Sequence, residues 1–99
     1  MDEYKILYLS EKDNVAVALS EIPANVSVMI QNNGKEMLVQ VLEPIRFGHK
    51  FAVRPIKKSE DIKKYGEVIG SAVMDIKAGA HVHVHNLEGK RGRGDKIVN

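Results

Sequence analysis

The chain has 99 residues, no cysteine and a formal net charge of +2 at pH 7. This length predicts a single domain spanning residues 1–99, and so small a charge gives no electrostatic reason to expect nucleic-acid binding. The fold uses no disulfide, the acidic N-terminus is unlike a signal peptide, and no apolar run approaches the ~18 residues of a membrane helix. We therefore expect a cytoplasmic protein that binds neither membranes nor nucleic acids.

The first half of the chain alternates short apolar runs with turn residues. Residues 15–19 have the length and apolar content of a buried strand. Residues 26–30 and 37–42 are predicted to pair as a hairpin, because Asn33 and Gly34 between them tolerate the positive φ of a tight turn. These patterns predict strands for this half of the chain.

Two further strands are expected in the second half, at residues 49–56 and 68–76. Pro55 lacks the N–H that a central strand needs, so it marks an edge or the end of the first of these strands. Gly70 is expected to mark a bulge in the second.

The only helical pattern lies between these two strands, at residues 59–65. Ser59 would cap the helix, Ile62 and Tyr65 would share one face, and Gly66 would end it after one or two turns. Many short strands joined by glycine and proline turns predict an all-β small roll or barrel with one short helical turn. We find no internal repeat in the sequence.

A run of alternating residues near the C-terminus contains three of the four histidines, His81, His83 and His85, separated by Val82 and Val84. In an extended strand the histidines share one face and the valines share the opposite, core-facing side. Neutral imidazole is a common ligand of Zn, Fe, Ni and Cu. The outer pair would lie roughly 13 Å apart in a straight strand, so a complete metal site needs a ligand from elsewhere in the chain. The alternative is a solvated face of ordinary histidines.

A second polar element, Gly48-His49-Lys50, begins the strand predicted at residues 49–56. Gly48 permits positive φ or a close backbone approach. His49 has the chemistry of an acid or base, and Lys50 that of an anion contact. We expect this element to lie near the histidine run; the alternative is a turn followed by a half-exposed strand.

The C-terminal residues 88–99 are rich in glycine and carry most of the excess positive charge. Such a segment is expected to fray, so we predict a core of about residues 8–87 and a flexible basic tail.

Five blocks of the sequence occur in the order that they have in a known family. They are Asp13-Asn14-Val15-Ala16-Val17-Ala18-Leu19, Gly48-His49-Lys50-Phe51-Ala52, Lys64-Tyr65-Gly66, Val68-Ile69-Gly70-x-Ala72 and Asp75-Ile76-x-x-Gly79-x-His81-Val82-His83-Val84-His85-Asn86. With these blocks the chain resembles the N-terminal SAF domain of the altronate and galactarate dehydratase family. It is also similar to the small subunits of sulfolactate sulfo-lyase. The resemblance covers about residues 8–87 and implies a β-clip fold.

The resemblance implies a lyase that eliminates water, or sulfite, from an acidic polyol substrate with the help of a divalent metal, Fe2+ being the usual candidate. No catalytic region follows Asn99, so we expect a stand-alone small subunit that is inactive alone. Its histidines would form a lid on an active site that a large catalytic subunit completes, and that subunit would hold most of the metal ligands. The alternatives are a sulfolactate sulfo-lyase small subunit and a SAF binding module without catalysis.

The expected site residues have three roles. They are His83, His49 and Lys50 as catalytic groups, Gly48, His85 and Asn86 as substrate contacts, and His81 and His83 as metal ligands.

Overall fold

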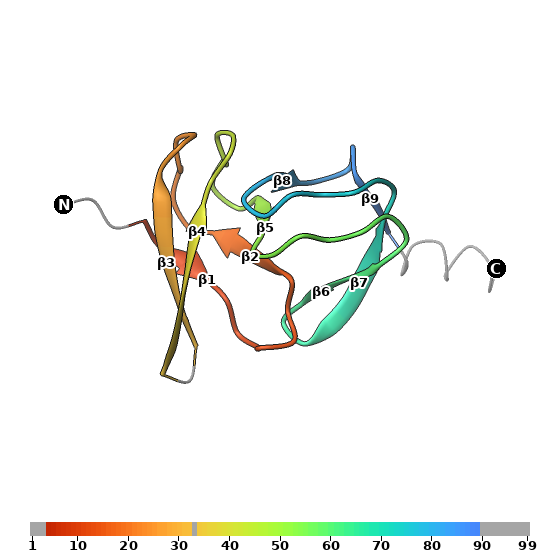
Figure 1. The fold of residues 1–99 in the computed structure, drawn as a ribbon, viewed down its shortest axis with the longest axis horizontal. Helices are drawn as coiled ribbons and strands as arrows, with labels where there is room; N and C mark the ends of the chain where they lie inside the picture. The colour runs from red at the N-terminus through yellow and green to blue at the C-terminus, as the bar shows by residue number, and fades with distance from the viewer. Residues whose placement is uncertain (1–3, 33, 90–99) are drawn as a thin grey trace.

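The computed structural model describes residues 4–32 and 34–89 of the chain. Within these residues every regular element is a β-strand, so none of them forms a helix long and apolar enough to cross a bilayer. The strands form three antiparallel sheets, and Figure 1 shows a central sheet with the other two on either side of it. The all-β fold class expected from the sequence is confirmed.

The strands of the described residues are, in chain order, β1 (Ile6–Leu7), β2 (Val15–Ala18), β3 (Ser27–Asn32), β4 (Lys35–Gln40), β5 (Lys50–Ala52), β6 (Asp61–Lys64), β7 (Glu67–Ala72), β8 (His81–Val82) and β9 (Leu87–Gly89). The central sheet has the order β1-β2-β5-β8, and the third sheet has the order β6-β7-β9. β3 and β4 form the predicted hairpin, in which Asn32 pairs with Lys35. Glu88 and Gly89 were expected in a flexible tail, but they pair with β7, whereas residues 90–99 lie outside the described part of the chain.

The central strands β2 and β5 are buried on both faces because successive side chains point to opposite sides of the sheet. Phe51, which is fully buried, packs with Ala16 in a cluster that also includes the inner face of the β3–β4 hairpin. Ala52 packs with Ile62 in a second cluster on the side of the β6–β7–β9 sheet. The molecule therefore has two small cores that share the central sheet.

A similar turn occurs four times in the described chain. In each, a buried isoleucine is followed three residues later by a residue with positive φ, whose N–H donates to a main-chain carbonyl of another segment. The four pairs are Ile22 and Asn25, Ile45 and Gly48, Ile56 and Ser59, and Ile76 and Gly79. The isoleucines form isolated bridges, Ile22 with Ile45 and Ile56 with Ile76. The order strand, turn, hairpin, turn thus occurs once from β2 and again from β5, a structural repeat that we did not find in the sequence.

The segment expected to be helical is strand β6, so that prediction is wrong. Tyr65 and Gly66 both have positive φ, 58° and 80°, and form the two-residue turn of the β6–β7 hairpin. The buried carboxylate of Asp13 accepts the N–H groups of both turn residues, each at 2.8 Å. The side chain of Asp13, which is remote in sequence, therefore stabilises a hairpin turn at Gly66, where the local pattern predicts the end of a helix.

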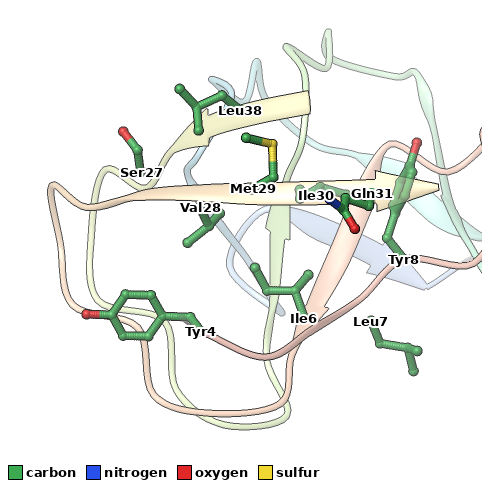
Figure 2. A pocket seen from close by; sticks show the side chains of 10 residues that line it. All are labelled: Tyr4, Ile6, Leu7, Tyr8, Ser27, Val28, Met29, Ile30, Gln31 and Leu38. Atoms are coloured by element: carbon green, nitrogen blue, oxygen red, sulfur yellow. The ribbon is translucent and has the colours of Figure 1, made fainter. Parts of the chain in front are cut away.

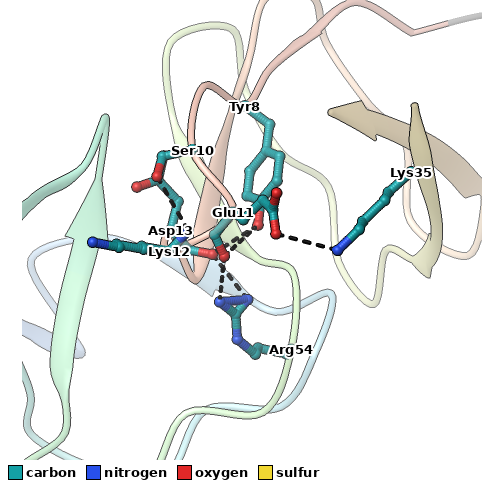
Figure 3. Close-up of polar contacts among 7 residues, drawn as sticks. All are labelled: Tyr8, Ser10, Glu11, Lys12, Asp13, Lys35 and Arg54. Carbon is teal, nitrogen blue, oxygen red and sulfur yellow. Dashed lines mark hydrogen bonds and ion pairs between the residues drawn. The ribbon is translucent and has the colours of Figure 1, made fainter. Parts of the chain in front are cut away.

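The segment that carries Asp13 is itself held by several contacts. The carbonyl oxygen of Asp13 accepts hydrogen bonds from Arg54 at 2.9 Å and from the Tyr8 hydroxyl at 3.0 Å (Figure 3). Asn14 is also buried, and its side chain donates to the Asp61 carbonyl and accepts the Lys63 N–H, both at 2.8 Å. The Asp13-Asn14 block of the sequence therefore fastens β6 to the central sheet.

The pairing of β6 with β7 is irregular beside Gly70, where a bulge was expected. Ile62 pairs with Gly70 and the next residue, Lys63, pairs with Val68, so one residue of β7 is extra. A side chain at Gly70 would collide with the carbonyl oxygen of Glu88 on β9, which explains the glycine at this position.

Candidate functional site

The register of β5 and β8 brings the four histidines together. Phe51 pairs with His81 and Lys50 pairs with Val82, so the next positions along the two strands belong to His49 and His83. The rings of His49 and His83 are stacked with centroids 4.4 Å apart, and His49 Nδ1 lies 2.9 Å from His81 Nε2. The prediction that the histidine run lies beside Gly48-His49-Lys50 is confirmed.

The histidine run is not one extended strand, as the alternation predicted. β8 ends at Val82, which is fully buried in the second core, and residues 83–86 form a turn. Val84 is 81% exposed at this turn, so the prediction that both valines face the core is wrong for Val84.

Asn86 gives the physical reason for the turn. Its side chain is 4% exposed, accepts the His83 N–H at 2.9 Å and donates to the His81 carbonyl at 2.8 Å. Both polar ends of this side chain are therefore occupied by the backbone of the turn. Asn86 therefore fixes the turn that carries the histidines, and its predicted role as a substrate contact stays a prediction.

The turn changes which histidines can share a metal ion. One ring nitrogen each of His49, His81 and His83 lies within 4.8 Å of the others. His49 therefore has the position expected of a ligand from elsewhere in the chain. His49 Nδ1 and His81 Nε2 lie within hydrogen-bond distance of each other, so in the metal-free chain one of these nitrogens donates to the other, according to the tautomers of the two rings. The donor set fits a divalent transition metal with further coordination positions open.

The local electrostatics favour neutral imidazoles. Burial, and then the neighbouring His49, lower the pKa of His81 below its ordinary value. Burial, His49 and Lys50 lower the pKa of His83 in the same way. Because only the neutral ring binds a metal, these shifts favour the ligand form near neutral pH.

Glu43 is a member of this site that we did not identify from the sequence. Its Oε2 accepts the N–H of His81 at 3.0 Å, and its charge partly opposes the lowering of the His81 pKa. Glu43 lies between Leu42 and Pro44 in an unremarkable stretch of sequence, and no motif marks it.

The remaining predicted residues lie at the edge of the cluster. Gly48 has a φ of 85°, and a methyl group added to it would meet nothing within 4 Å, so its positive φ, and not a close approach, requires glycine. His85 is exposed, with its ring centroid 5.3 Å from that of His81. Lys50 is half-buried, and burial followed by the nearby Lys64 lowers its pKa. The roles predicted for these three residues stay predictions.

A separate cavity of about 590 Å³ lies between the N-terminal segment and the β3–β4 hairpin. Figure 2 shows that its lining includes Tyr4, Met29 and Leu38, and no histidine or lysine is among the residues that line it. The groups with metal-binding and acid–base chemistry therefore lie outside this cavity, at the end of β5 and β8.

Comparisons with known proteins agree with the resemblance. Residues 4–90 match the family described as "Altronate/galactarate dehydratase SAF domain". The chain is 43% identical over 74 residues to the altronate dehydratase of Escherichia coli (strain K12), a match that covers 75% of this chain and 14% of that protein. A match to the altronate dehydratase of Bacillus subtilis (strain 168), 37% identical over 80 residues, covers 81% of this chain and 15% of the relative.

The chain is also 37% identical over 62 residues to the (2R)-sulfolactate sulfo-lyase subunit alpha of Chromohalobacter salexigens, which covers 63% of this chain and 66% of that subunit. It thus spans a small part of the altronate dehydratases and about two thirds of this subunit. The family match includes both the Gly48 turn and the histidine turn. With its all-β architecture of short strands, which is consistent with a β-clip, the chain belongs to the altronate/galactarate dehydratase SAF domain family.

Proposed function

We propose that this SAF domain contributes histidine ligands to a metal-dependent lyase that eliminates water or sulfite from an acidic hydroxy substrate. The observation that supports the proposal most is the convergence of His49, His81 and His83 at the end of β5 and β8. Relatives of the chain are named as altronate dehydratases and as subunits of a sulfo-lyase, which supports lyase chemistry. In this proposal the enzyme acts in the cytoplasm.

Elimination next to a carboxylate requires a base for an acidified C–H bond and an acid for the leaving group. His49, His81 and His83 would hold the divalent ion, for which Fe2+ is our candidate. When bound, the ion stabilises negative charge on substrate oxygens. Lys50 and the exposed His85 border these ligands. They are the proposed contacts for the acidic group of the substrate and for the proton that is transferred during elimination. Gly48 leaves room for the substrate beside His49.

We further propose a large catalytic subunit as partner, which would supply the remaining metal ligands and most of the substrate-binding surface. The altronate dehydratases extend far beyond the matched region, which is 14% to 15% of their length. The described part of this chain offers one cluster of three potential metal ligands. We therefore expect the chain to be inactive when assayed alone.

A second candidate is the small subunit of a sulfolactate sulfo-lyase. The match to the (2R)-sulfolactate sulfo-lyase subunit alpha of Paracoccus pantotrophus, 33% identical, covers 94% of that protein. The two candidates differ in the leaving group, so parallel assays with altronate, galactarate and (2R)-sulfolactate separate them. A binding module without catalysis would be active with none of these substrates.

The experiment that tests the proposal compares four histidine variants in the enzyme assembled with a candidate catalytic subunit. His49→Gln, His81→Gln and His83→Gln keep a polar side chain but remove a ligand, and each should lower bound metal and reduce turnover by roughly 10²-fold or more. His85→Gln is the matched control for metal content, because His85 is not in the ligand set. Near-native metal content and turnover in all three ligand variants would show that the histidines are only a solvated face.

A further inference from the structure

Glu43 is held against the segment that leads into β8. The N–H of the preceding residue, Leu42, donates to the carbonyl of Gly79 at 2.9 Å. Gly79 in turn lies so close to the Gln40 carbonyl oxygen that no side chain fits there. The main chain on the N-terminal side of Glu43 is therefore held against the segment that leads into His81, and the Glu43 side chain is half-buried there.

The hydrogen bond from His81 to Glu43 satisfies a donor that the sheet leaves open. β8 lies at the edge of the central sheet, and the N–H of Ala52 bonds to the carbonyl of Ala80. In an antiparallel pair the next residue, His81, then directs its N–H away from β5. Glu43 Oε2 accepts this N–H at 3.0 Å, where an edge strand would otherwise bond water or another strand.

The carboxylate also brings negative charge to the histidine cluster. Among the charges that act on His81, Glu43 is the acidic one, and His49, His83 and His85 are the others. Among the described residues no lysine or arginine forms an ion pair with Glu43. A half-buried carboxylate with no ion-pair partner in residues 4–32 and 34–89, beside three imidazoles whose ring nitrogens lie close together, is suited to a divalent cation held by these imidazoles.

We propose that Glu43 is a positioning residue of the metal site, which fixes the main chain of His81 and raises the affinity of His49, His81 and His83 for a divalent cation. The inference rests on the proposed function, because it requires that the three histidines bind a metal. The proposal adds to the site the Glu43 carboxylate, which lies in the loop after β4. No sequence motif connects this loop with the histidines.

The test measures the affinity of the full chain for Co2+, whose visible absorption reports both binding and coordination geometry. Glu43→Gln keeps a hydrogen-bond acceptor for His81 but removes the charge, and Glu43→Ala removes both. We expect about tenfold weaker Co2+ binding for Glu43→Gln and a larger loss, with an altered spectrum, for Glu43→Ala. Glu67→Gln is the matched control, because it removes the same charge from an exposed position on β7 and should bind Co2+ as the native chain does.

The possible outcomes separate three claims: the effect of the Glu43 charge, the positioning of His81, and the metal site itself. If Glu43→Gln binds as tightly as the native chain and Glu43→Ala does not, the charge contribution is overturned and the positioning of His81 is supported. If both variants bind as the native chain does while the His83→Gln chain loses the metal, the inference fails and the proposed metal site stands. If Co2+ binds neither to the native chain alone nor to the chain assembled with the proposed catalytic subunit, the metal site fails and Glu43 loses its role with it.

Discussion

The imidazole rings of His49 and His83 lie nearly parallel, with centroids 4.4 Å apart and an angle of 13° between their planes. They flank β5 and β8, two strands that are far apart in sequence and adjacent in the central sheet. A charge on the neighbouring His49 disfavours the charged form of His83, so this contact helps, after burial, to lower the pKa of His83. This relationship makes both the stability of the domain and the state of the site sensitive to pH.

We predict that the metal-free chain loses stability as the pH falls below about 6.5, the ordinary pKa of histidine. Burial and neighbouring charges lower the pKa of His81 and of His83 in the folded state. Between the folded and unfolded pKa values the unfolded chain binds more protons, so the free energy of unfolding decreases as the pH decreases and is greatest above 6.5. Urea unfolding at pH 7.5 and pH 5.5 measures the difference. The double variant His81→Gln/His83→Gln should show a smaller difference; an unchanged pH dependence in this variant would contradict the assignment.

Replacing Asn86 with alanine should open the histidine turn. The change removes an acceptor for the His83 N–H and a donor to the His81 carbonyl. Loss of two largely buried hydrogen bonds predicts a decrease of about 1–3 kcal/mol in the free energy of unfolding, together with weaker metal binding. Val84→Ala is the control from the same turn, and because Val84 is 81% exposed its effect should stay within about 0.5 kcal/mol. Equal stability of the two variants would argue against the role of Asn86.

Alanine should be tolerated far less well at Gly79 than at Gly48, although both glycines have positive φ, 88° and 85°. At Gly48 the added methyl group meets nothing within 4 Å, so the expected cost is the backbone strain of about 1–2 kcal/mol. At Gly79 it would also collide with the carbonyl oxygen of Gln40, which adds a rearrangement of about 1–3 kcal/mol. Chemical denaturation of the two variants measures the difference, and similar midpoints would contradict the close approach seen in the structure.

Docking of the proposed catalytic subunit should depend on the apolar residues that border the histidines. Phe47 is 65% exposed at the Gly48 turn, and Val84 is the exposed tip of the histidine turn. Large apolar side chains in such positions are typical of interaction surfaces. We expect Phe47→Ser and Val84→Ser to weaken co-elution with the subunit in size-exclusion chromatography. Leu38→Ser, also 65% exposed but on the β3–β4 hairpin, should not weaken it; an equal effect of all three changes would oppose an interface at the histidines.

The elements that the sequence predicts well are those whose geometry depends on local residues. The Asn33-Gly34 pair between two apolar runs predicted the β3–β4 hairpin, because few other residues tolerate such a turn. The run at residues 15–19 predicted β2, because a short stretch that is apolar on both faces suits a strand inside a sheet.

The errors arise where a polar side chain, and not the hydrophobic pattern, determines the path of the backbone. Tyr65 and Gly66 form a hairpin turn because the carboxylate of Asp13 accepts their N–H groups, and nothing near Tyr65 in sequence indicates this. The alternation of histidine and valine predicted a longer strand, whereas the side chain of Asn86 ends it after Val82. The Asp13 contacts join residues that only the folded chain brings together, whereas Asn86 acts within its own turn through hydrogen bonds that the hydrophobic pattern does not reveal.

The candidate site was predictable in part. The histidine run and Gly48-His49-Lys50 were identified from composition, spacing and resemblance, and the need for a ligand outside the run follows from strand geometry. That His49 lies beside the run and can be proposed as this ligand depends on the β5–β8 register. Glu43 could not be found, because it contacts the backbone of His81, and an acceptor for a main-chain N–H leaves no pattern in the sequence.

The turn that occurs four times in the described chain has a consequence for how such a site can form. His49 directly follows the turn that closes the first repeat, and Ala80 and His81 directly follow the turn that closes the second. The strands that follow these two turns, β5 and β8, pair with each other in the central sheet and so bring His49 beside His81. Both histidines are only half-buried, so the side chains at these positions can differ without disturbing either core. Two like halves thus provide adjacent positions for ligand-binding side chains without an additional structural element.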